Sequence, residues 1–73
     1  MSSRAEYLRM AVAAFDAGDL NEAANALEKS DHPIDLENAV NCRNLAFGGA
    51  PYMVQTLGRI LRQHLEMAEM FKR

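Results

Sequence analysis

Cys42, His32 and His64 are the side chains of this sequence best suited to nucleophilic or acid–base chemistry. A thiol beside an imidazole can form a nucleophile–base pair when a third group orients the base. These residues have neither a glycine-framed nucleophile turn nor an orienting acid at a recognisable spacing. The sequence therefore predicts a protein that is not an enzyme, with Cys42 as a small core residue.

The nearest approach to a metal-binding cluster is formed by Asp31, His32 and Asp35. A zinc site needs three or four ligands, but Asp31 suits a turn and Asp35 suits a helix N-cap. His64 and Glu66 are two residues apart, and side chains at that spacing diverge on a helix. We expect neither a metal ion nor a cofactor.

A glycine pair, Gly48-Gly49, precedes the last helical segment and invites comparison with a phosphate-binding loop. Pro51 removes one backbone amide from the following helix start, and no Lys-Ser or Lys-Thr follows. The pair is better explained as a tight turn between helices.

The composition restricts the fold class. The 73 residues are 49% hydrophobic, include twelve alanines and no tryptophan, and leave room for one domain, residues 1–73. Abundant alanine favours closely packed helices over a β-sandwich or barrel. A chain this short buries only about 60% of its unfolded surface, so we expect a second copy or a partner to supplement a small all-α bundle.

Charge and cysteine content indicate the environment. The net charge is −2, with −5 in residues 1–37 and +3 in residues 38–73, a division that favours attraction between copies over a broad basic surface. A single cysteine is typical of a reduced compartment. No leader or membrane-spanning stretch is recognisable, so a cytoplasmic protein without a membrane partner is expected.

The first two helices are marked by their caps. Ser3 and Glu6 have the spacing of a capping box, and Gly18 should end the helix that begins near Arg4. Asp19 is placed to cap a second helix that continues to Ser30. The short connection predicts an antiparallel hairpin, with these apolar positions buried: Leu8, Ala11, Val12, Phe15, Leu20, Ala23, Ala24 and Leu27.

Residues 14–23, with the sequence AFDAGDLNEA, resemble the turn of a tetratricopeptide helical hairpin, and Pro33 falls near the terminal proline of that repeat. The resemblance covers residues 5–33. It implies a tight helix pair and a role in protein binding.

Two further helices follow. Asp35 is predicted to cap a third helix over residues 36–47, and Pro51 to begin a long last helix that continues to the C-terminus. The third helix carries apolar residues at Leu36, Ala39, Val40, Cys42, Leu45, Ala46 and Phe47. The last helix is apolar over more of its circumference than one hairpin can cover.

This wide apolar surface predicts two contact regions on the last helix. A heptad-like seam is predicted for self-association and consists of Val54, Leu57, Leu61, His64, Ala68 and Phe71. The residues beside it are predicted to contact a protein partner: Tyr52, Met53, Arg59, Arg62, Met67 and Met70. Methionines are suited to such a surface because they adapt to many shapes.

The expected function is protein binding without catalysis. We expect a small homodimer that modulates or inhibits a larger bacterial or phage-related protein machine. The alternative is a DNA-binding regulator with a helix-turn-helix at about residues 36–63, in which the residues that would approach the groove are Tyr52, Gln55, Thr56, Arg59 and Arg62. The acidic balance of the chain argues against nucleic acid as the partner.

Overall fold

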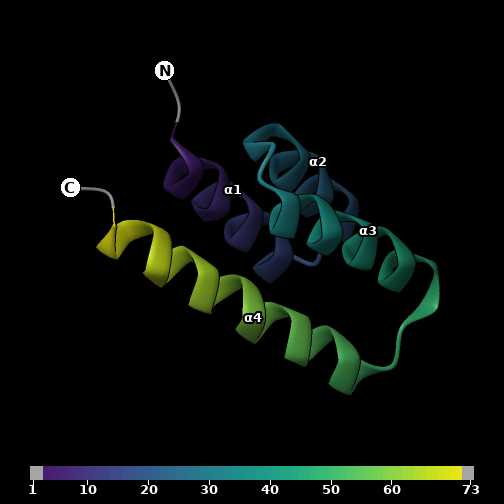
Figure 1. Ribbon diagram of the computed structural model, residues 1–73. Helices are drawn as coiled ribbons and strands as arrows, with labels where there is room; N and C mark the ends of the chain where they lie inside the picture. Colours follow the sequence, from purple (N-terminus) through teal and green to yellow (C-terminus); the bar gives the residue numbers. More distant parts are fainter. Residues whose placement is uncertain (1–2, 72–73) are drawn as a thin grey trace.

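Four α-helices build the protein. The computed structural model describes residues 3–71, which contain α1 (Arg4–Asp16), α2 (Leu20–Ser30), α3 (Pro33–Gly48) and α4 (Pro51–Met70) and no strand (Figure 1). The prediction of a small all-α bundle with an N-terminal hairpin and a long last helix is confirmed. Each helix packs on the next in the chain, and α4 returns alongside α1.

The ends of the hairpin follow the predicted caps. The Glu6 amide donates to Ser3 Oγ at 3.3 Å, and the Ser3 amide donates to a Glu6 carboxylate oxygen at 3.4 Å. Gly18 takes a φ of +84°, a conformation that favours glycine, and so allows the chain to reverse after α1. Asp19 then accepts a hydrogen bond from the Glu22 amide at 3.1 Å and caps α2.

The N-cap prediction for α3 is wrong. The helix begins at Pro33, and His32 is the cap, with its Nδ1 accepting from the Ile34 amide at 3.4 Å. Asp35 lies inside the first turn, where its carboxylate is fully buried and binds the Arg4 guanidinium. The carboxylate is therefore used to join α3 to α1.

This placement of Asp35 also changes the buried face of α3. The buried residues are Asp35, Asn38, Ala39 and Cys42. Four residues expected on the apolar face lie on the exposed side instead: Leu36, Val40, Ala46 and Phe47. Because residues on both faces of α3 are apolar, the position of Asp35 against Arg4 decides which face turns inward.

Small side chains dominate the core. Alanines at positions 11, 23, 24, 26 and 39 are buried with six larger residues, Leu8, Phe15, Leu27, Cys42, Leu57 and Leu61. Close packing also involves Gly58 of α4, because a Cβ there would lie 2.9 Å from Phe15 Cε1 of α1. The absence of a side chain at Gly58 lets α4 approach α1.

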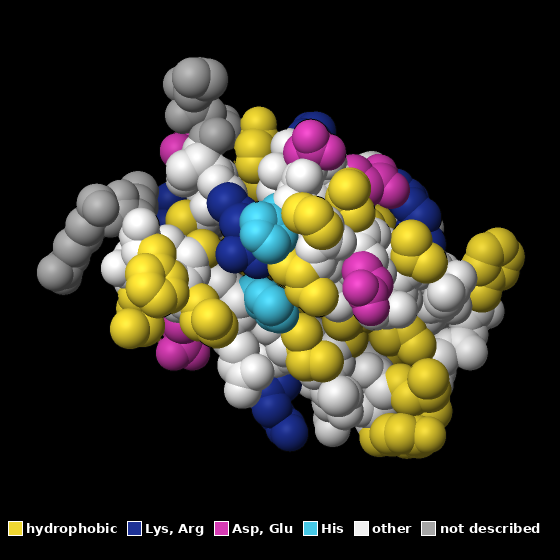
Figure 2. Space-filling view, viewed as in Figure 1, with side chains coloured by type: hydrophobic (Ala, Val, Ile, Leu, Met, Phe, Trp, Pro, Cys, Tyr) yellow, Lys and Arg dark blue, Asp and Glu magenta, His cyan; other side chains and the backbone are white. Residues whose placement is uncertain are grey.

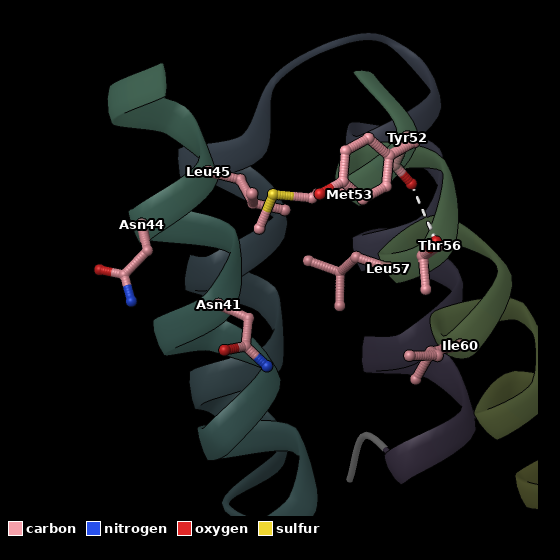
Figure 3. Close-up of a pocket in the computed structure, with 8 residues that line it drawn as sticks. All are labelled: Asn41, Asn44, Leu45, Tyr52, Met53, Thr56, Leu57 and Ile60. Carbon is pink, nitrogen blue, oxygen red and sulfur yellow. Dashed lines mark hydrogen bonds between the residues drawn. The ribbon is translucent and has the colours of Figure 1, made fainter. Parts of the chain in front are cut away.

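The contact between α3 and α4 is much less extensive than the contact between α1 and α4. The two helices run side by side in opposite directions from a short connection at Gly49 and Ala50 (Figures 1 and 3). Gly48 takes a φ of +150°, and a Cβ on Gly49 would lie only 2.2 Å from Leu45 Cδ2. The connection thus favours glycine. The side of the bundle between α3 and α4 is open, because the two helices contact each other little.

Candidate functional site

A groove of about 370 Å³ lies between α3 and α4. Figure 3 shows the side chains of both helices that line it, with α3 as one wall and α4 as the other. The α3 wall consists of Asn41, Asn44 and Leu45, and the α4 wall of Tyr52, Met53, Thr56, Leu57 and Ile60. The groove exists because α4 is held against α1 and only lightly against α3.

The groove is uncharged and mainly apolar. Leu45 and Ile60 are half-buried, whereas Tyr52 is 70% exposed and Met53 44% exposed. The Thr56 hydroxyl donates to the Tyr52 carbonyl oxygen at 2.8 Å, so its hydrogen is already used within α4. The lining includes no carboxylate, imidazole or thiol. This chemistry suits the binding of an apolar surface that also forms hydrogen bonds with amide side chains.

Asn38 extends the polar side of the groove into the interior. Its Oδ1 accepts from Asn41 Nδ2 at 3.4 Å, and its own Nδ2 is buried without a hydrogen-bond partner. The spacing of Asn38, Asn41 and Leu45 places them on one face of α3. Sequence reasoning missed this face, although the i, i+3 spacing of the asparagines was the available signal.

Large apolar side chains are also exposed outside the groove. On the outer side of α3, Val40 is 57% exposed and Phe47 is 97% exposed. Met67, Met70 and Phe71 are exposed near the end of α4. On the face of the molecule shown in Figure 2, hydrophobic side chains are widely spread, and the two histidines lie next to a basic side chain. The exposed apolar surface therefore extends beyond the groove.

The structure places most of the predicted self-association seam inside the chain's own fold. Leu57 and Leu61 are core residues, Val54 and Ala68 pack against the core, and His64 is half-buried. Phe71 alone of the seam is largely exposed, at 78%. The heptad-like pattern thus identifies the side of α4 that packs on its own chain.

The residues predicted to bind a partner remain accessible, but they do not form one site. Tyr52 and Met53 line the groove, whereas Met67 and Met70 lie near the other end of α4. Arg62 forms an ion pair with Asp16 of α1. Arg59 is exposed and has no ion-pair partner among residues 3–71.

Ion pairs occupy most of the arginines that a nucleic-acid interface would need. In addition to Arg62, Arg9 pairs with Glu69 at 2.7 Å and Arg43 with Glu28 at 2.8 Å. Arg4 is bound to Asp35. Moreover, α3 and α4 run side by side, whereas helix-turn-helix motifs cross their two helices at a large angle (Figure 1). Neither the charges nor the helix arrangement of the described residues favours the DNA-binding alternative.

A partly buried polar cluster around Asp35 connects all four helices. Arg4 Nε donates to Asp35 Oδ2 at 2.8 Å, and Arg4 Nη2 donates to Oδ1 at 2.9 Å. The Ser30 hydroxyl donates to Asp35 Oδ2 at 2.6 Å, and His64 Nδ1 lies 3.4 Å from Arg4 Nη2. Burial alone would raise the pKa of Asp35, but the hydrogen bonds from Arg4 and Ser30 and the Arg4 charge lower it below its usual value. Both carboxylate oxygens of Asp35 thus accept hydrogen bonds from within the chain, and the cluster has a structural role.

The candidate nucleophile has no activating surroundings. Cys42 is completely buried, and this burial raises the pKa of its thiol to about 11, against a small lowering by Arg43. A thiol of that pKa is protonated at neutral pH and unreactive. Within residues 3–71, no three His, Cys, Asp or Glu side chains are arranged to hold a metal ion.

Comparison of the chain with protein-family models, with curated proteins and with solved structures found no match. Over the described residues, none of the helices combines the length and apolar character needed to span a bilayer. What the protein does must therefore be inferred from its own surface.

Proposed function

We propose that this chain is a non-enzymatic protein-binding module and that its binding surface is the groove between α3 and α4. The observation that carries the proposal is an uncharged groove between two helices with exposed Tyr52 and Met53 on its wall. A groove of this kind between two helices is a common docking site for the apolar face of another protein. A module that works by occupying a surface would modulate or inhibit the protein it binds.

The arrangement of the lining supports protein binding over binding of a small charged ligand. No charged group lines the groove, so phosphate, carboxylate and ammonium groups would find no counter-charge there. Tyr52 and Met53 instead offer adaptable apolar contact area, which is characteristic of protein interfaces. The amides of Asn41 and Asn44 can hydrogen-bond a partner at the edge of the groove.

The proposal can be tested by site-specific photo-cross-linking. A benzophenone amino acid is placed at Met53 in the groove or at Glu22, an exposed position on α2, which makes no helix contact with α4. After irradiation of expressing cells, protein adducts are expected from position 53 and not from position 22. Equal labelling from both positions, or no adduct from position 53, would refute the groove as a binding surface.

A further inference from the structure

Each wall of the groove carries one charged residue outside its lining. Glu37 lies four and seven residues before Asn41 and Asn44, on the same face of α3. Arg59 lies three and seven residues after Thr56 and Tyr52, at the outer edge of that face of α4, where it also lines a second hollow toward α1. Both charged side chains are exposed, and neither forms an ion pair among residues 3–71. One edge of the groove is therefore acidic and the other basic.

The two charges lie at nearly the same level along the groove. Arg4 contacts both Asp35 of α3 and His64 of α4, so these two positions mark a common level. Glu37 is two residues beyond Asp35, and Arg59 is five residues before His64 on the antiparallel helix. At about 1.5 Å per residue, the levels of Glu37 and Arg59 differ by less than about one helical turn.

We propose that the partner of the groove is a second copy of this chain, in a symmetric dimer whose two-fold axis runs parallel to the groove. In this arrangement α3 of one copy faces α4 of the other, and Glu37 of each copy faces Arg59 of its partner. The inference rests on the proposed function, because it names the protein that occupies the proposed binding surface.

The lining of the groove meets the requirements of a two-fold contact. A surface that binds its own copy must be complementary to itself, so like charges in its centre would repel. The lining residues are uncharged, and the amides of Asn41 and Asn44 both donate and accept hydrogen bonds. The single opposite charges on the two edges become attractive pairs only when α3 faces α4.

The groove presents exposed apolar area of its own. Tyr52 is 70% exposed and Met53 44% exposed in the groove. Tyr52 alone presents roughly 150 Å². A stable interface buries about 800 Å² per partner, so Tyr52 and Met53 would form its centre, and the other lining residues and the edges of the two helices would supply the rest.

The dimer is tested by sedimentation velocity on the full chain over a dilution series up to about 100 μM. Glu37→Arg and Arg59→Glu each convert two attractive pairs into two repulsive ones. Each variant alone is expected to raise the dimer Kd by about tenfold or more. The double charge swap restores both pairs and should return the Kd to the wild-type value. Lys29→Glu, which changes the charge equally on α2, should leave the Kd unchanged.

A second pair of variants tests the apolar contact. Tyr52→Ser removes an exposed aromatic side chain from the groove, whereas Phe71→Ser removes one of similar exposure outside it. Only Tyr52→Ser should weaken the dimer, by about tenfold. Because both side chains are exposed, helical circular dichroism should show that both variants remain folded.

Several results would overturn the proposed dimer. These are a wild-type chain that is monomeric at every concentration, a double charge swap that does not restore association, or an equal effect of Tyr52→Ser and Phe71→Ser. Cross-linking from position 53 separates this failure from that of the proposed function. Adducts of twice the chain mass support the dimer, whereas only heavier adducts would refute it and retain the groove as a binding site for a different protein.

Discussion

The buried pair of Arg4 and Asp35 provides the sharpest test of how this fold is stabilised. Arg4→Met keeps most of the length of the side chain and removes its charge, which leaves the Asp35 carboxylate with the Ser30 hydroxyl as its remaining donor. Loss of one partner from a buried ion pair costs about 3–5 kcal/mol. Because 26% of the Arg4 side chain is exposed, we expect a value at the low end, about 3 kcal/mol.

This loss is large for a chain of 73 residues. Domains of that size have total stabilities of about 4–11 kcal/mol, and a loss of about 3 kcal/mol should lower the Tm by about 12–24 °C. Urea unfolding followed by circular dichroism measures the free energy, and thermal unfolding measures the Tm. Arg4→Met with Asp35→Leu removes both charges and should recover most of the loss, because an apolar pair replaces the ion pair.

The pH dependence of the unfolding free energy is a second test of the Arg4–Asp35 pair. In the wild type, the folded-state pKa of Asp35 is lower than its unfolded-state pKa, which is about 4. The Arg4–Asp35 pair therefore stabilises the fold above the unfolded-state pKa, and this contribution is lost as pH falls through the folded-state pKa. In Arg4→Met, burial dominates and raises the pKa of Asp35, so acidification should favour the folded variant. The difference in unfolding free energy between the two proteins should therefore shrink from pH 7 to pH 4. A loss below about 1 kcal/mol at pH 7, or a difference independent of pH, would show that the Arg4–Asp35 pair does not stabilise the fold in this way.

Three further predictions concern the core. Gly58→Ala should lower the free energy of unfolding by about 1 kcal/mol in the wild type, because its Cβ meets the Phe15 ring. In a Phe15→Leu background the same substitution should stabilise the fold by up to about 1 kcal/mol through helix propensity. Urea unfolding of all four proteins tests this, and equal effects in both backgrounds would contradict it. Cys42 should react with a thiol reagent at pH 8 at less than about 1% of its rate in denaturant, because its pKa is about 11 and it is buried. Leu61→Ala should cost about 2–4 kcal/mol, whereas Phe47→Ala should change the unfolding free energy by less than about 0.5 kcal/mol because Phe47 is 97% exposed; similar costs for the two would show that the buried face is assigned incorrectly.

Local residue patterns predict the number of helices and most of their ends. Ser3, Gly18, Asp19 and Pro51 act through local hydrogen bonds and backbone preferences, which depend on residues a few positions away. The buried stripes of α1 and α2 were also predictable, because each of those helices has one predominantly apolar face. The heptad-like pattern of α4, predicted for self-association, coincides with the side of the helix that packs on its own chain.

Which faces of α3 and α4 remain free depends on contacts between residues far apart in the chain. Asp35 is a better N-cap than His32 by residue type, and its use as the partner of Arg4 depends on a contact between residues 31 positions apart. A periodic apolar seam likewise cannot indicate whether its own chain or a second chain will cover it. In this fold the close approach of Phe15 to Gly58 brings α4 against α1. Leu57 and Leu61 are therefore covered by their own chain. The same approach holds α4 on α1, and the groove beside α3 is the physical consequence.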